Sequence, residues 1–83
     1  MALDEAARQL KLATHDAQVA FDCLGLGDLE HAHTHAITAR TACDAAEAVL
    51  REALGRIPAG AAETEGEQAV LDAEGITPHP MAT

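Results

Sequence analysis

The feature that most limits the fold of this chain is a pair of apolar stripes with residues spaced three and four apart. The upstream stripe consists of Leu3, Ala6, Leu10, Ala13, Ala17, Ala20 and Leu24, and the downstream stripe of Leu29, Ala32, Ala36, Ala39, Cys43, Ala46, Leu50 and Leu54. This spacing places each stripe along one face of an α-helix. Because most of these residues are small, the sequence predicts two helices that approach each other closely.

The segment between the two stripes reads Gly-Leu-Gly-Asp and predicts a tight turn. Gly25 is expected to end the first helix in the left-handed conformation, with Leu26 packed on Phe21 as in a Schellman cap. Asp28 is expected to be the N-cap of the second helix. Residues 1–55 are therefore predicted to form an all-α antiparallel helical hairpin, with helices at about 3–24 and 28–54.

The character of the chain changes after this hairpin. Residues 56–63 are rich in glycine, proline and alanine and are interpreted as a linker. Thr64 and Glu67 form a capping-box pattern that predicts a short C-terminal helix at 64–76, closed by Gly75 with Ile76 over Leu71. Such a short helix is marginal alone and is ordered only if it docks. Residues 77–83 are predicted to be a flexible, extended tail.

Charge and size exclude several classes of protein. The chain has 83 residues, a formal net charge of −9 and only five lysine and arginine residues, whereas nucleic-acid binding requires clustered cations. No run of about 18 apolar residues predicts a membrane span. A chain this short, held by alanine rather than aromatic side chains, buries little apolar area, and self-association is the natural remedy.

The cysteines and the N-terminus suggest a reducing environment. If the hairpin is correct, Cys23 and Cys43 lie roughly 20 Å apart along the helix axis, too far to form a disulfide. Free thiols are the simpler interpretation. The acidic N-terminal residues do not resemble a secretory signal, so a cytoplasmic location is expected.

A second set of apolar residues lies off the two stripes. It consists of Leu12, Val19, Ile37 and Val49 in the hairpin, with Val70 and Leu71 in the C-terminal helix. A hairpin that buries one face of each helix leaves these residues exposed, so we interpret them as an interface. Pairing of two hairpins into a helical bundle would cover them, as would docking on a larger protein. The alternative is that they are scattered exposed aliphatics, which are ordinary when they occur singly.

Histidines form the one cluster that suggests metal chemistry. His31 and His35 share a helix face at a spacing that can present two imidazoles to Zn, Cu or Ni. His33 points to the opposite side of the same helix.

Further ligands for such a metal would come from nearby positions. His15 in the facing helix is expected within about one turn of His35, and Asp16 or Glu30 could complete the set. The competing interpretation is that these are polar boundary residues at the mouth of the hairpin. No resident cofactor is expected beyond this metal alternative.

The sequence contains no recognisable catalytic group. It has no serine, and Gly25-Leu26-Gly27 lacks the strand that precedes a phosphate-binding loop. Cys43 on the stripe is expected to pack as an inert small hydrophobe. The chain is therefore predicted not to be an enzyme.

Four hypotheses for function follow. The first is a small acidic interaction or assembly module, an accessory or structural component that binds itself or a larger protein. The second is a divalent-metal-binding hairpin that uses His31, His35 and His15. The third is an acidic inhibitor that occupies a basic groove, and the fourth is a peptide precursor with a processed C-terminal tail.

Overall fold

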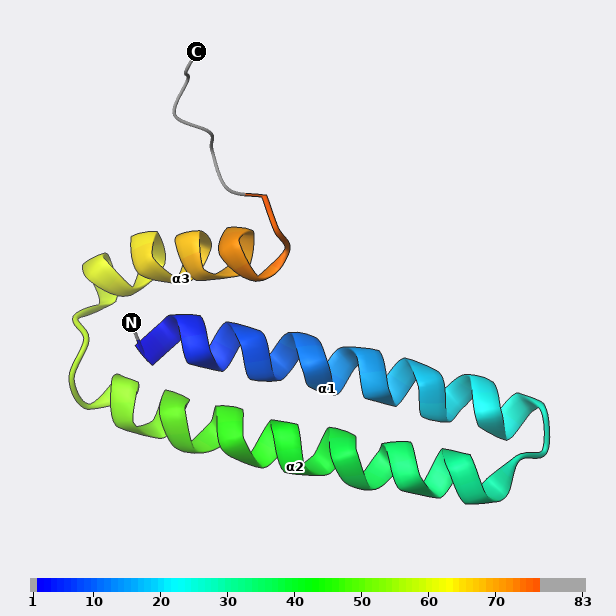
Figure 1. The fold of residues 1–83 in the computed structure, drawn as a ribbon. Helices are drawn as coiled ribbons and strands as arrows, with labels where there is room; N and C mark the ends of the chain where they lie inside the picture. Colours follow the sequence, from blue (N-terminus) through cyan, green and yellow to red (C-terminus); the bar gives the residue numbers. More distant parts are fainter. Residues whose placement is uncertain (1, 77–83) are drawn as a thin grey trace, which may run out of the picture.

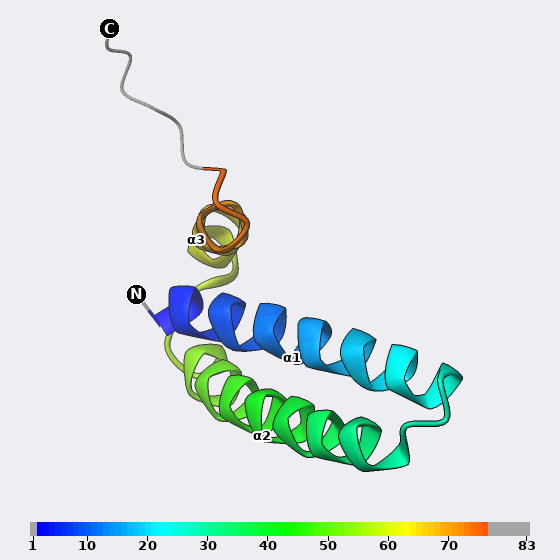
Figure 2. The same cartoon turned by 45° about the vertical axis from the view of Figure 1, so that its right-hand side comes forward.

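The computed structural model describes residues 2–76, which form three helices and no strand. Helix α1 spans Ala2–Gly25, α2 spans Leu29–Leu54 and α3 spans Ala59–Ala73. Figure 1 shows α1 and α2 as a long antiparallel hairpin, with α3 beside α1. Within the described residues α3 contacts α1 but not α2, and Figure 2 likewise places α1 between the other two helices. The predicted all-α hairpin is confirmed.

The turn between α1 and α2 is built around Gly27, not Gly25. Gly27 has a φ of 75°, and its amide donates to the Leu24 carbonyl at 3.0 Å while the Asp28 amide donates to the Cys23 carbonyl at 2.9 Å. These two bonds are those of a Schellman cap with Gly27 at the left-handed position. Gly25 is the last residue of α1. Glycine is preferred at the left-handed position that ends a helix, and both Gly25 and Gly27 meet this preference. Only Gly27 places Asp28 where its amide closes α1 and its side chain begins α2.

This shift also removes the predicted Leu26 and Phe21 cap contact. Leu26 is 85% exposed and Phe21 71% exposed, so both side chains lie in solvent. The cap bonds explain the difference, because the residue after the left-handed glycine is Asp28, not Leu26. The turn is therefore held by backbone hydrogen bonds and carries an exposed apolar tip.

The interface between α1 and α2 is a heptad seam in which every residue is buried or half-buried. We call it the buried seam. It consists of Ala6, Gln9, Ala13, Asp16, Ala20 and Cys23 on α1 and Ala32, His35, Ala39, Ala42, Ala46, Val49 and Ala53 on α2. Its fully buried apolar residues are all alanine, which lets the two backbones approach closely. Steps of three and four residues repeated over heptads are the pattern of a coiled-coil interface.

The predicted stripes contain only half of this seam. Their alanines at positions such as Ala6, Ala13 and Ala46 are buried, but the residues between them, including Leu10 and Leu50, are exposed. Two different stripes satisfy the three-and-four spacing, and they share one row of alanines. The row of the buried seam that the prediction lacks contains polar side chains such as Asp16 and His35. The predicted stripes are apolar throughout, so the spacing of apolar residues favours them.

Helix α3 begins inside the stretch that was predicted to be a linker. It starts at Ala59 after Pro58, which has a φ of −64° and provides no side-chain cap. Thr64 is therefore an interior residue and not the N-cap, because alanines after Pro58 already favour helix. The helix ends at Ala73 and not at 76, but the predicted closure at Gly75 is observed. Gly75 has a φ of 77°, and the Ile76 amide donates to the Leu71 carbonyl at 2.8 Å.

Two contacts hold α3 near α1. Ala69 is only 2% exposed, and Lys11 Nζ lies 3.0 Å from Glu74 Oε1. The ion pair is half exposed at both ends and is therefore weak. The predicted flexible tail at 77–83 lies outside the described residues.

The two glycines of the turn provide a matched test of the cap. Gly27→Ala should destabilise the chain by about 1–2 kcal/mol, because an alanine at positive φ is strained. Gly25→Ala should stabilise it by about 0.5–1 kcal/mol, because Gly25 is helical and an added Cβ meets nothing within 4 Å. Urea unfolding of both variants measures these changes. The opposite order would place the left-handed cap at Gly25.

Candidate interaction surface

One broad side of the hairpin is apolar over its whole length. We call it the outer apolar face. It consists of Leu3, Leu10, Ala17 and Leu24 on α1 and Leu29, Ala36, Cys43 and Leu50 on α2. All of them except the half-buried Leu3 are exposed, and none carries a charge. A row of this kind lies beside the buried seam because each of its members is four residues from one seam position and three from the next.

Surface hollows show that residues from both helices meet on this side. Leu10 of α1 lines one hollow together with Cys43 and Leu50 of α2. A groove of about 310 Å³ lies at the open end of the hairpin. Its walls include Leu3 and Leu10 from α1, Leu50 and Leu54 from α2, and Val70 from α3. Helix α3 therefore extends the outer apolar face at this end.

The exposed fractions of the leucines are large for so small a protein. Leu10 is 43% exposed, Leu24 58%, Leu29 66%, Leu50 38% and Leu54 85%. Within the described residues no apolar side chain larger than alanine is buried. Contiguous apolar surface of this kind typically marks a site of protein association.

Of the interface residues predicted from the sequence, Val70 lies in the wall of the groove and the others occupy other positions. Leu12 is 46% exposed, Ile37 40% and Val70 56%, whereas Val19, Val49 and Leu71 are half-buried. Val49 lies in the buried seam between Ala46 and Ala53, so α1 already covers part of it.

Sequence reasoning missed Leu10, Leu24, Leu29 and Leu50 as surface residues. The three-and-four spacing of these leucines predicts that they face the interior of the hairpin. Cys43 was assigned there too, and it is an exposed free thiol.

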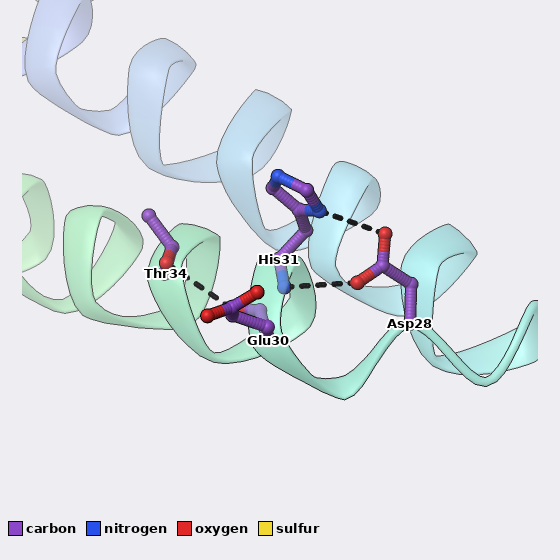
Figure 3. A network of polar contacts seen from close by, with 4 residues as sticks. All are labelled: Asp28, Glu30, His31 and Thr34. Carbon is purple, nitrogen blue, oxygen red and sulfur yellow. Dashed lines mark hydrogen bonds and ion pairs between the residues drawn. The ribbon is translucent and has the colours of Figure 1, made fainter.

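Asp28 organises the start of α2, as the sequence predicted. Its Oδ1 accepts from the His31 amide at 3.2 Å, and its Oδ2 lies 2.7 Å from His31 Nδ1 (Figure 3). The hydrogen bonds from the side chain and the backbone of His31 lower the pKa of Asp28 below its ordinary value of 3.8. Figure 3 also shows Thr34, whose hydroxyl donates to the Glu30 carbonyl one turn earlier. His31 is therefore part of a helix cap.

A second histidine is paired inside the hairpin. His35 Nδ1 lies 3.0 Å from Asp16 Oδ1, in a contact between α2 and α1. The Asp16 side chain is only 8% exposed and His35 is 34% exposed. The other carboxylate oxygen of Asp16 is buried and has no hydrogen-bond partner. This pair is the main polar contact within a seam that is otherwise mostly alanine.

The structure separates the remaining histidines from this pair. His15 is exposed and lines a surface hollow with Lys11, Thr14 and Glu74, on the side of α1 that faces α3. His33 is exposed as well. Among residues 2–76 no group of three or more histidine, cysteine, aspartate or glutamate side chains is arranged to hold a metal ion. Asp16, not His15, lies beside His35.

Comparisons with known proteins add no functional information. No protein-family model, curated protein or solved structure matches the chain. In the part of the chain that the structure describes, no helix is both long enough and apolar enough to cross a membrane. The candidate site therefore rests on the geometry of the described residues.

The cap at Asp28 predicts a pH-dependent stability. Because the pKa of Asp28 is lowered by folding, its carboxylate stabilises the fold above pH 3.8, and this stabilisation is lost as the pH falls through the lowered pKa. We expect Asp28→Asn to melt at a lower temperature than the parent chain at neutral pH, and the difference to shrink below pH 3.8. Melting followed by circular dichroism measures it. A difference that is equal at all pH values would contradict this role.

The Asp16 and His35 pair predicts unequal effects of its two truncations. His35→Ala leaves a buried carboxylate without its partner and should destabilise the chain by about 1–3 kcal/mol. Asp16→Ala should be less destabilising, because it replaces the buried carboxylate, whose loss of hydration costs free energy, with another alanine of the seam. Chemical unfolding of both single variants and the double variant measures the coupling. A larger loss in Asp16→Ala would show that the pair is a net source of stability.

Proposed function

We propose that the chain is a non-catalytic protein-interaction module that acts by covering its outer apolar face with another protein chain. One observation carries this proposal. Every buried apolar residue in the described part of the chain is an alanine, and the leucines lie outside. Self-association and docking on a larger protein are both forms of this function.

The energetics support this function. Burial of one methylene-sized group contributes about 0.8 kcal/mol, whereas full burial of a leucine contributes about 1.5–3 kcal/mol. A hairpin that buries alanines and exposes leucines therefore leaves most of its available stabilisation unused. Small domains commonly recover such stabilisation by oligomerisation, a metal or disulfides. The two cysteines here are free, and no metal-binding group occurs among residues 2–76.

Charge also favours an apolar contact. The chain carries a net charge of −9, but the outer apolar face contains no ionisable carboxylate, lysine or arginine. Association through this face therefore depends on burial of apolar area. The acidic-inhibitor alternative requires charge attraction instead, which salt weakens.

The metal-binding alternative has one observation in its favour. His31 and His35 each direct Nδ1 at a carboxylate, which is how metal-binding histidines are commonly oriented. Further ligands would have to come from a second molecule, because the described residues supply no third ligand to this pair. This alternative predicts that assembly depends on metal.

The proposal predicts that stability depends on protein concentration. The mass measured by light scattering should exceed that of one chain, and the melting temperature should rise with concentration because association stabilises the folded state. Addition of equimolar Zn²⁺ should change neither result. A change of mass only with Zn²⁺ would favour the metal alternative.

Salt separates the apolar contact from a charged one. Raising NaCl from about 20 mM to about 500 mM should tighten self-association, because it screens repulsion between two acidic chains. A stable, cooperatively folded monomer whose melting temperature does not depend on concentration would overturn self-association. That outcome would leave docking on a larger protein as the remaining form of this function.

A further inference from the structure

We infer that the partner of the outer apolar face is the same face of a second copy, packed around a two-fold axis that runs across the helices. This inference rests on the proposed function and specifies its partner and geometry. The result is a four-helix core in which α1 lies on the partner's α1 and α2 on the partner's α2, each pair antiparallel. The groove at the open end of one copy then lies over the turn end of the other.

The number of apolar positions per heptad supports a bundle. A coiled coil of two helices needs two such positions per heptad, whereas a helix in a bundle core needs three. In α1 and α2 two rows lie in the buried seam, one of alanine and one that includes the polar Gln9, Asp16 and His35, and the outer apolar face adds a third row. Helix α3 borders α1 from the groove as far as His15. Beyond it the third position is exposed, at Ala17 and Leu24 of α1 and at Leu29, Ala36 and Cys43 of α2.

The order of large and small side chains selects the axis. Facing residues form four layers along the hairpin, namely Leu3 with Leu50, Leu10 with Cys43, Ala17 with Ala36, and Leu24 with Leu29. An axis across the helices reverses this order in the second copy. The layer that contains Leu10 then packs on the partner's alanine layer, so a larger layer meets a smaller one.

The alternative axis, parallel to the helices, gives poorer packing. It places the layer of Ala17 and Ala36 on its own copy, so four alanines meet and leave a void. It also places the layer of Leu10 and Cys43 on itself, so this layer no longer packs on the smaller alanine layer. The leucine layers at the two ends meet leucine with either axis. Native interiors avoid such voids, because they are destabilising.

The available area is sufficient for a dimer. Helix α1 has 24 residues and is therefore about 36 Å long. Two helices whose axes are about 8–10 Å apart present a face about 20 Å wide, or roughly 700 Å² per copy. Stable interfaces bury about 800 Å² per partner. The groove, to which Val70 contributes, adds to the area of the hairpin itself.

The rim of the face is compatible with a like-charged partner. Glu47 and Arg51 border Leu50 and form an ion pair with a distance of 3.1 Å. The carboxylate nearest to this part of the face is therefore locally compensated. Repulsion between two copies comes from more distant charges, which salt screens.

Leu10 and Leu12 provide a matched test of the face. They lie on the same helix and are 43% and 46% exposed. Because they are two residues apart, their side chains point about 200° away from each other. Leu10→Asp should raise the dissociation constant of the dimer by about 100-fold or more, because it buries a charge in the contact. Leu12→Asp should change it by less than about threefold. Sedimentation velocity measures both, and equal effects would overturn the assignment of the face.

Crosslinking tests the axis with a milder change. The inferred geometry places Cys43 opposite Ala36 of the second copy, so A36C in a Cys23→Ala background should form an intermolecular disulfide under mild oxidation. Within one chain the two positions are about 10 Å apart along α2, too far for a disulfide. The control is T38C in the same background, which places the new thiol on the opposite side and should not crosslink.

The outcomes separate the inference from the function on which it rests. A dimer that A36C fails to crosslink would overturn the two-fold geometry and leave self-association intact. Efficient crosslinking through Cys43 alone would also overturn it, because the inferred axis holds the two Cys43 residues about two helical turns apart. A concentration-independent monomer would overturn the inferred dimer and self-association, and would leave docking on a larger protein as the form of the proposed function.

Discussion

The close approach of α1 and α2 through alanine is the contact on which the rest of the structure depends. Ala6, Ala13, Ala42 and Ala46 are almost completely buried, and side chains of this size let two backbones pack closely. The same contact has a cost, because alanine removes little apolar area from water. The leucines of both helices lie outside this contact, most of them on the outer apolar face. The surface that we propose for association is thus a direct consequence of the small residues inside.

A seam of repeated alanines does not define its own register. If one helix slid past the other by one heptad, alanine would still meet alanine. The contact between Asp16 and His35 forms only in the observed register, because a slip by one heptad would leave the carboxylate buried without the imidazole. A single polar pair in an apolar interface can specify register in this way, at some cost in stability. This explains why an aspartate with one unpartnered oxygen is retained in the seam.

Asp28 illustrates how one residue can serve two helices. Its amide closes the cap of α1 through Cys23, while its carboxylate begins α2 through His31. The turn therefore needs no packed core of its own, and Leu26 remains exposed. Helix α3 is attached less firmly, since its described polar contact with α1 is the exposed pair of Lys11 and Glu74. Its contribution to the outer apolar face comes mainly from the wall of the groove.

The sequence by itself determined the helices, the antiparallel hairpin, the cap at Asp28 and the Schellman end at Gly75, because these follow from local periodicity and backbone preference. Tertiary structure decided which of two overlapping stripes is buried. Leu10 and Ala13 satisfy the same spacing, and only the rotation of each helix about its axis separates an exposed leucine from a buried alanine. That rotation is set by side-chain volume across the interface and by the bond between Asp16 and His35, which join residues distant in the chain.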